Sequence, residues 1–296
     1  MHPQLAGWHI GVIGGSGLYG GLGLDEEQQI PVASAFGEPS GSVTMGTLGG
    51  VRFTFIARHG AAHRLSASHV NYRANIDVLK RCGVTDVLAI SAIGSLREER
   101  APGQVVVPNQ FIDRTDGRAR SFFDAGVTAH VGLADPVCPR LAELGAAAAE
   151  AAGATVHRGG CYVAIEGPQF STRAESELYR QWGADVIGMT AMPEARLARE
   201  AELPYAVLGM VTDYDCWRAG ATIDAAEILE RMRANVKTAH QTLSHFAASL
   251  PADRTESPID RALDNAVVTP PEQWDRGVMA RLDAVAGRYY RARVGD

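Results

Sequence analysis

The sequence has few cysteines, no long apolar run and no excess of basic residues. Its four cysteines lie far apart, and their spacing indicates neither a metal site nor a disulfide framework. No apolar run approaches the roughly 18 residues that span a bilayer, so we expect no membrane partner. Residues 1–7 also lack the basic and apolar regions of a signal peptide. We therefore expect reduced thiols and a cytoplasmic location.

The charge balance argues against a nucleic-acid partner. The formal net charge is −6 at pH 7, which leaves no excess of the basic residues that bind a phosphate backbone. Hydrophobic residues make up 46% of the 296 residues and charged residues 21%, values that are ordinary for a globular protein with a substantial core. This composition favours a soluble enzyme or binding protein.

Apolar runs of strand length alternate with helical patterns in residues 159–217. The runs cover residues 160–165, 184–190 and 205–211. Strands that alternate with helices predict an α/β fold with a mostly parallel sheet. Ligands of such sheets bind beyond the carboxyl ends of the strands. We therefore expect residues 166–171, 189–190 and 213–215, which follow the three runs, to converge on one site.

The composition changes after residue 250. Residues 251–271 are polar and contain prolines, as in a linker, whereas residues 272–290 have the spacing of one more helix. We predict a main domain over residues 1–250. Residues 251–296 would form a C-terminal extension that is helical and packs on the main domain.

A glycine-rich turn at residues 14–20 follows the first predicted strand, residues 8–13. The glycines at positions 15, 17 and 20 fit the pattern G-x-G-x-x-G of dinucleotide-binding proteins. That fingerprint requires a helix directly after it, but here the chain continues through further glycines to Pro31. The pattern therefore favours a phosphate-binding turn, in which backbone N–H groups approach an anion. A nucleotide- or dinucleotide-binding protein is the alternative that is not an enzyme.

Groups that bind anions stand at the ends of four predicted strands. They are the hydroxyls of Ser16, Ser91 and Thr190 and the pair Arg58 and His59. A guanidinium can bind two oxygens of one phosphate at once. Together these residues could surround a single phosphate, which is a more specific signal than any one of them.

Asp213 and Asp215 are separated by one residue just after an apolar strand, so in an extended segment their side chains would point the same way. Such a pair suits a general acid, an acceptor for an amino group, or metal ligands. A metal needs further carboxylates or histidines, and none stands nearby. His59 and His63 likewise lack a third ligand, so we expect no metal.

Six segments occur in an order that is typical of one family. They are residues 14–18 (GGSGL), 57–60 (ARHG), 71–75 (NYRAN), 94–99 (GSLREE), 166–175 (EGPQFSTRAE) and 212–217 (TDYDCW). The chain resembles the methylthioadenosine phosphorylases of the trimeric purine nucleoside phosphorylase family over about residues 10–250. The resemblance implies a single α/β domain, with a central mixed, mostly parallel sheet flanked by helices, and a homotrimer.

The resemblance also implies a reaction. These pentosyltransferases cleave the N-glycosidic bond of a purine nucleoside with inorganic phosphate, and they release the base and a sugar 1-phosphate. Phosphate is a co-substrate, and no cofactor is expected. The expected nucleoside is 5′-methylthioadenosine; another 5′-deoxy-5′-substituted adenosine, adenosine and inosine are the alternatives.

Residue roles follow from the matching motifs. By the resemblance, phosphate would be held by Ser16, Arg58, His59, Ser91, Ala92 and Thr190. The nucleoside would be contacted by Met189 along the ribose and by Phe170 and Ser171 at the base. Asp213 and Asp215 would face the purine, with Asp213 as the acid that protonates N7, a role that requires a raised pKa. A carboxylate can also accept from a 6-amino group, so we expect adenine rather than hypoxanthine as the base.

The 5′ side of the site is less fully specified. His130 matches the family residue that reaches across the interface into a neighbouring subunit's 5′ pocket. Ile223 would be an apolar wall of that pocket, and Ala225 is the alternative, because the spacing there departs from that of the family. Gly188 stands where many methylthioadenosine enzymes have Asn, and in this respect the chain is more similar to the purine nucleoside phosphorylases. The preferred 5′ substituent therefore stays open.

Overall fold

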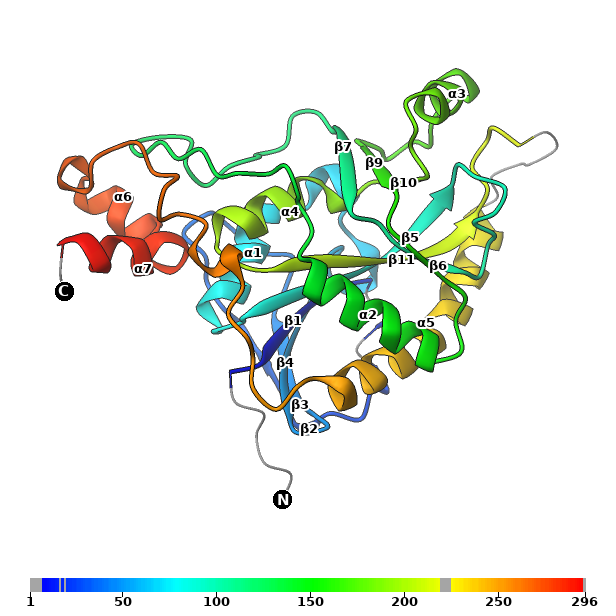
Figure 1. Cartoon of the computed structure of the whole chain (residues 1–296), viewed down its shortest axis with the longest axis horizontal. Coiled ribbons are helices and arrows are strands. Elements are labelled where there is room, and N and C mark those ends of the chain that lie inside the picture. The colour runs from blue at the N-terminus through cyan, green and yellow to red at the C-terminus, as the bar shows by residue number, and fades with distance from the viewer. Residues whose placement is uncertain (1–6, 16, 19, 219–224, 295–296) are drawn as a thin grey trace.

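A computed structural model describes residues 7–15, 17–18, 20–218 and 225–294. Figure 1 shows a central sheet with helices on both sides. The described strands form one 11-stranded sheet, in which six strand pairs are parallel and four are antiparallel. The predicted single α/β domain with a mixed, mostly parallel sheet is confirmed.

The strands run in the order β2-β3-β4-β1-β5-β10-β9-β7, while β11 pairs with β5 and β6, and β6 pairs with β8. Their bounds are β1 His9–Gly14, β2 Asp25–Ile30, β3 Val43–Leu48, β4 Val51–Ala57, β5 Asp86–Ser95, β6 Val105–Val107, β7 Gln110–Arg114, β8 Val156–Arg158, β9 Cys161–Ile165, β10 Val186–Gly188 and β11 Tyr205–Asp213. At the centre, β5 lies parallel to both β1 and β11. Its last two residues pair antiparallel with β10.

Two hydrophobic cores lie on opposite faces of the sheet. Consecutive side chains of a strand point to opposite faces, so in β5 Val87 and Ala89 belong to one core and Leu88 and Ile90 to the other. This is why the central strands read as continuous apolar runs and not as alternating patterns.

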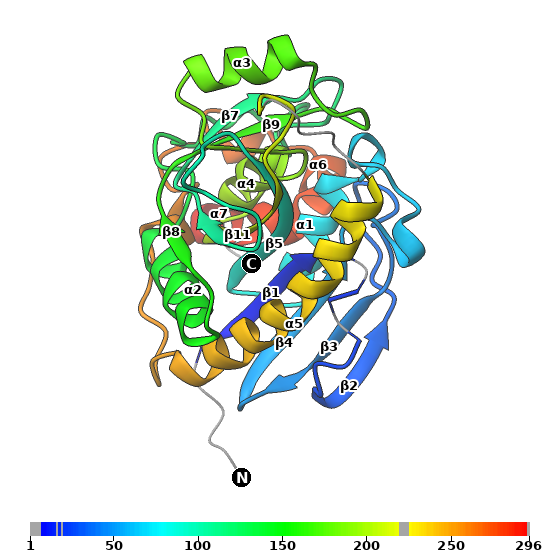
Figure 2. The same ribbon diagram turned by 90° about the vertical axis from the view of Figure 1, so that its right-hand side faces the viewer.

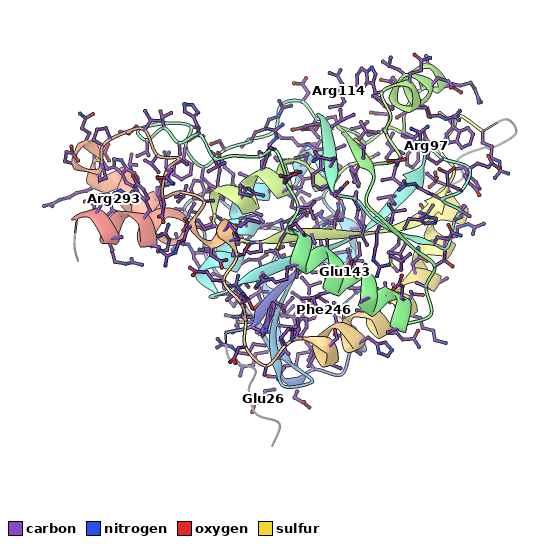
Figure 3. The ribbon with its side chains drawn as sticks, in the orientation of Figure 1. Glu26, Arg97, Arg114, Glu143, Phe246 and Arg293 are labelled. Atoms are coloured by element: carbon purple, nitrogen blue, oxygen red, sulfur yellow. The ribbon has the colours of Figure 1, made fainter. Side chains whose placement is uncertain are left out.

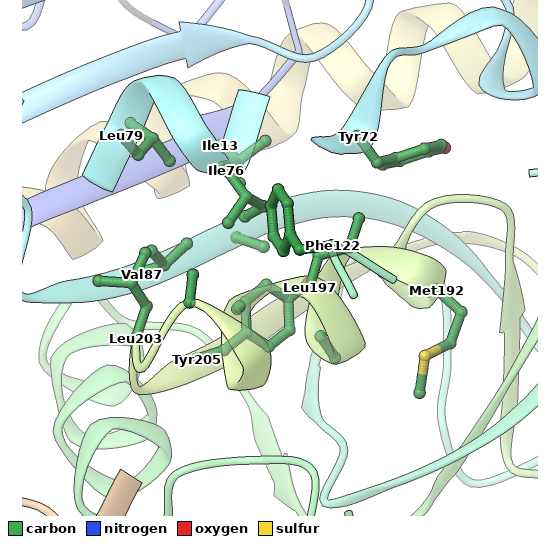
Figure 4. Packing of buried hydrophobic residues seen from close by; sticks show 14 of the residues in the cluster. Ile13, Tyr72, Ile76, Leu79, Val87, Phe122, Met192, Leu197, Leu203 and Tyr205 are labelled. Carbon is green, nitrogen blue, oxygen red and sulfur yellow. The ribbon is translucent and has the colours of Figure 1, made fainter. Parts of the chain in front are cut away.

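The described residues form seven α-helices. They are α1 Tyr72–Arg81, α2 Pro139–Ala151, α3 Arg173–Gln181, α4 Ala191–Glu200, α5 Ala225–Ser249, α6 Arg276–Arg281 and α7 Asp283–Val294. Helices α1 and α4 close the first core, where Ile76, Leu79 and Leu197 pack against Val87 (Figure 4). Helices α2 and α5 lie side by side over the second core (Figure 2), and Phe246 of α5 is fully buried there (Figure 3).

The C-terminal extension contains two short helices where the sequence predicted one. Helix α6 begins after Asp275, whose side chain accepts a hydrogen bond from the backbone N–H of Val278. The helical geometry ends at Leu282, which is buried in the core beside α1, and α7 follows. Arg288 of α7 also binds the buried Glu202 at 2.6 Å. The division of the chain at residue 250 stays a prediction.

Glu200 at the end of α4 is expected to make the stability of the protein depend on pH. Its carboxylate accepts hydrogen bonds from Ser121 Oγ at 2.8 Å and from the backbone N–H of Phe122 at 2.6 Å. Burial raises the pKa of this carboxyl from its ordinary value of 4.5 to about 7. Between these values the folded chain binds a proton that the unfolded chain has lost, so stability falls as the pH rises through this window.

Replacing Glu200 with Gln removes the titration and keeps an acceptor for Phe122. We expect the variant to be more stable than the parent by up to about 3 kcal/mol at pH 8 and to differ little from it at pH 4.5. Urea unfolding at the two pH values measures the difference. If the free energies of unfolding of the variant and the parent differ by the same amount at pH 8 and at pH 4.5, this role of Glu200 is contradicted.

Candidate functional site

A pocket of about 560 Å³ opens where several parallel strands end. Gly15 follows β1, Arg58 follows β4, Met189 follows β10, and Ile165 and Asp213 are the last residues of β9 and β11. The pocket therefore lies at the carboxyl ends of the strands, where the sequence placed it. Its size suits a small organic ligand.

Most of the predicted site residues line this pocket. They are Arg58, His59, Ser91, Ala92, Phe170, Ser171, Met189, Thr190, Asp213 and Asp215. His130 does not line it; its side chain is exposed, and its backbone N–H donates to the carbonyl of Ala266 at 2.8 Å. Ser16 and Ile223 lie outside the described residues. The individual roles of all these residues stay predictions.

Two hydroxyl groups meet at one end of the pocket. Ser91 Oγ and Thr190 Oγ1 are 3.2 Å apart, although they come from β5 and from the residue before α4. Both side chains are nearly buried. Hydroxyl groups that share a buried site can both turn their protons toward an anion.

Arg58 reaches the same end of the pocket, but the Nε and Nη2 side of its guanidinium group is turned toward Glu194 and not toward the pocket. Its Nε and Nη2 donate to the two carboxylate oxygens of Glu194 at 2.6 and 3.1 Å, and both residues are at most 2% exposed. Nη1 donates to the carbonyl of Ile90, and Nη2 donates also to that of Ile13. Four of the five guanidinium N–H groups are thus used within the described chain. One N–H of Nη1 remains for a ligand, so the phosphate contact of Arg58 stays a prediction that depends on this single donor.

His59 is a neutral ring with a defined tautomer. Its Nδ1 lies 2.9 Å from the carbonyl of Leu65, which can only accept, so Nδ1 carries the proton and Nε2 is an acceptor. Burial, together with the charge of Arg58, lowers the pKa of His59 to about 4. At neutral pH this ring can therefore accept a proton from a ligand hydroxyl but adds no charge.

Asp213 and Asp215 lie at the other end of the pocket. The chain is not extended here as expected: Asp215 has a φ of 48° in a turn, and its backbone N–H donates to Asp213 Oδ1 at 2.8 Å. Asp213 Oδ2 also accepts from Thr212 Oγ1 at 2.7 Å. Both carboxyl groups still line the pocket, because the turn folds Asp215 back beside Asp213.

Asp215 is the more deeply buried carboxyl of the two. It is 3% exposed and accepts a hydrogen bond of 2.5 Å from Ser176 Oγ of α3. Burial raises the pKa of Asp215, and the charge of Asp213 adds to this effect, while the bond from Ser176 opposes it. A carboxyl group of this kind keeps its proton to a higher pH than an exposed aspartate does.

The sequence analysis missed three residues that build the site. Ser176 supports Asp215, Glu194 holds Arg58, and Arg118 joins the loops after β9 and β10. Arg118 donates to Glu166 Oε2 at 2.8 Å and to the carbonyl of Met189 at 2.7 Å. No local pattern marks Arg118, since it stands in a turn-rich stretch far from its partners in the sequence. Glu194 could have been suspected, because this carboxylate directly follows Pro193 at the end of an apolar stretch.

Tyr162 accounts for the glycine at position 188. A Cβ atom on Gly188 would lie 2.1 Å from the hydroxyl oxygen of Tyr162, which is fully buried. That hydroxyl also lies 3.5 Å from the backbone N of Thr190. An Asn at position 188 would therefore require a different residue at 162.

Three further features are absent from the part of the chain that the structure describes. Among the described residues, no group of three or more His, Cys, Asp or Glu side chains is arranged to hold a metal ion. The described part of the chain between β1 and β2 contains no helix, so the element that a dinucleotide fingerprint requires does not follow the glycine-rich turn. None of the described helices has the length and apolarity that crossing a membrane requires.

The chain is similar to known proteins over nearly its full length. The model of the family described as "Phosphorylase superfamily" matches residues 9–248. S-methyl-5′-thioadenosine phosphorylase of Cereibacter sphaeroides is 51% identical, and the match covers 94% of this chain and 97% of that protein. The protein of the same name from Bradyrhizobium diazoefficiens is 50% identical, with 95% and 98% covered.

Solved structures give the same result. A methylthioadenosine phosphorylase from an Antarctic soil metagenomic library has a TM-score of 0.90 to this chain and 43% identity, with 94% of this chain and 98% of that one covered. A variant of adenosine/methylthioadenosine phosphorylase from Schistosoma mansoni, in complex with methylthioadenosine, has a TM-score of 0.75 and 36% identity, with 81% and 91% covered.

Proposed function

Because this chain belongs to the phosphorylase superfamily, we propose that its pocket binds 5′-methylthioadenosine and inorganic phosphate and joins them in a phosphorolysis. The enzyme cleaves the N-glycosidic bond and releases adenine and 5-methylthioribose 1-phosphate. The observation that carries this function is that one pocket is lined by the hydroxyls of Ser91 and Thr190, its anion-binding end, and by Asp213 and Asp215, its carboxyl end. Along β5 the two ends are separated, because Asp213 pairs with Gly94, three residues beyond Ser91. The relatives of about 50% identity, which share nearly the whole chain, support the same substrate.

The anion-binding end positions the nucleophile. Phosphate would accept hydrogen bonds from the hydroxyls of Ser91 and Thr190 and from the remaining N–H of Arg58. Its own O–H would donate a hydrogen bond to Nε2 of His59. One phosphate oxygen attacks C1′ of the ribose as the C1′–N9 bond breaks, and the bonding electrons leave with the purine. A fixed anion stabilises the positive charge that develops on the sugar, and proximity makes the attack effectively unimolecular.

The carboxyl end receives the leaving group. Negative charge builds on the purine as the bond breaks, and a proton delivered to N7 neutralises it. We assign this proton to Asp213 within the hydrogen-bonded pair, and we assign to Asp215 the contact with the 6-amino group. The backbone N–H of Asp215 and Thr212 Oγ1 both donate to the Asp213 carboxyl group and hold it in place at this end of the pocket.

Substrate competition tests the choice of nucleoside. With phosphate in excess, kcat/KM is measured for methylthioadenosine, adenosine and methylthioinosine in parallel. We expect methylthioadenosine to be preferred and the 6-oxo compound to be the poorest substrate. A preference for methylthioinosine would overturn the assignment of the base, while a preference for adenosine would overturn the assignment of the 5′ substituent.

The working form of the enzyme is proposed to be a cytoplasmic homotrimer. Phe170 lines the pocket yet is 50% exposed, and His130 lies outside the pocket of its own chain, as expected if a neighbouring subunit completes the site. The four free cysteines support a reducing compartment. Sedimentation at micromolar concentration should give a trimer; a monomer with full activity would contradict the shared site.

A further inference from the structure

The charges around the pocket leave one cation uncompensated. The ionisable residues that line it are Arg58, His59, His63, Arg64, Asp213 and Asp215. The charge of Arg58 is balanced by Glu194 in a buried ion pair. Burial lowers the pKa of both His59 and His63, so neither ring is charged at neutral pH. Arg64 is exposed and forms no ion pair with any carboxylate that the structure describes.

The backbone holds Arg64 beside the anion-binding end. The backbone N–H of Leu65 donates to the carbonyl of His59 at 3.0 Å, and the ring of His59 donates back to the carbonyl of Leu65 at 2.9 Å. The ring of His63 stacks on that of His59, with the centroids 4.1 Å apart. The two neighbours of Arg64 in the sequence are thus both fixed to His59.

The turn that carries Arg64 has little freedom. Ala62 and His63 adopt positive φ angles of 54° and 57°, which non-glycine residues rarely do. Gly60 has a φ of 69°, and a Cβ there would lie 2.9 Å from the carbonyl oxygen of Ser40. A strained turn of this kind persists where the surrounding structure fixes it, and here it turns Arg64 toward the pocket.

We propose that Arg64 is a phosphate-recruiting residue: it supplies the net positive charge that the buried pair Arg58–Glu194 cannot supply to the incoming phosphate. The proposal rests on the proposed phosphorolysis. Phosphate arrives largely as a dianion at a protein whose net charge is −6, in a pocket that already holds two carboxyl groups. A single unpaired guanidinium at the mouth attracts the anion and can form charge-assisted hydrogen bonds with its outer oxygens.

The test compares three variants with the parent enzyme. Arg64→Gln removes the charge, and Arg64→Lys keeps it. The control is Arg261→Gln, which also removes one positive charge; Arg261 is 59% exposed, pairs with Glu256 and does not line the pocket. The KM for phosphate is measured at saturating methylthioadenosine, and the KM for methylthioadenosine and kcat at saturating phosphate.

We expect Arg64→Gln to raise the KM for phosphate by about tenfold or more, with kcat and the KM for methylthioadenosine changed less than about threefold. Arg64→Lys should recover most of the loss, and Arg261→Gln should behave as the parent. Added NaCl should raise the phosphate KM of the parent more steeply than that of Arg64→Gln.

Two results would overturn the role of Arg64. One is an unchanged phosphate KM in Arg64→Gln; the other is an equal rise in both KM values that Lys does not reverse, which would indicate a structural role of the turn. A parent enzyme that needs no phosphate would instead refute the proposed function, so the two failures can be told apart.

Discussion

Replacing Asp213 with Asn is expected to lower kcat/KM for methylthioadenosine by about 10²–10⁴-fold, the range that general acid catalysis contributes. The amide has the same size and keeps an oxygen that can accept from Thr212 Oγ1 or from the backbone N–H of Asp215. It cannot deliver a proton to N7, so the negative charge on the leaving adenine stays uncompensated. The loss should appear mainly in kcat, because the group acts in the transition state.

Asp215→Asn and Ser176→Ala serve as companions to this variant. Asp215 lies beside Asp213 and binds Ser176 Oγ at 2.5 Å, so both changes perturb the same end of the pocket. We expect a smaller loss for Asp215→Asn, mainly in the KM, and a still smaller loss for Ser176→Ala. Nearly full activity of Asp213→Asn would contradict its role, and a larger loss of kcat in Asp215→Asn would move the acid to Asp215.

Replacing Glu194 with Gln is expected to reduce the free energy of unfolding by about 3–5 kcal/mol, the cost of leaving a buried charge without its partner. Arg58 would keep its positive charge at 2% exposure, and the new amide would turn N–H groups toward a guanidinium that can only donate. Tyr205 would also lose the carboxylate oxygen that it now contacts at 3.0 Å. Urea unfolding at fixed protein concentration measures the change.

Glu150→Gln is the matched control for this prediction. Glu150 also pairs with an arginine, Arg158, but the two side chains are 45% and 41% exposed. An exposed pair of this kind contributes little to the free energy of unfolding, because water and salt screen it. If Glu194→Gln costs no more than Glu150→Gln, then Glu194 does not hold a charged Arg58 in the way described.

The position of the site could be predicted from the sequence, because it depends on local patterns. Apolar runs that end at polar residues mark parallel strands and their carboxyl ends, and this is how residues as distant as Arg58 and Asp213 could be placed in one pocket. The edge of the sheet was not predicted. Strand β2 has the sequence DEEQQI and is almost wholly exposed, so it shows no apolar pattern at all.

The partners of the site residues could not be predicted for a different reason. Glu194 lies 136 residues from Arg58, and Arg118 lies 48 residues from Glu166. Such pairs depend on the packing of α4 and of the loop after β7, which no local spacing encodes. The break between α6 and α7 could not be predicted from local spacing either. It lies at Leu282, which is buried in the core.

Release of adenine from methylthioadenosine, with and without inorganic phosphate, tests the central claim most directly. We expect no release without phosphate, and with phosphate we expect equal amounts of adenine and 5-methylthioribose 1-phosphate. Release at the same rate without phosphate would show that water is the nucleophile, and it would contradict the phosphate site assigned to Arg58, Ser91 and Thr190.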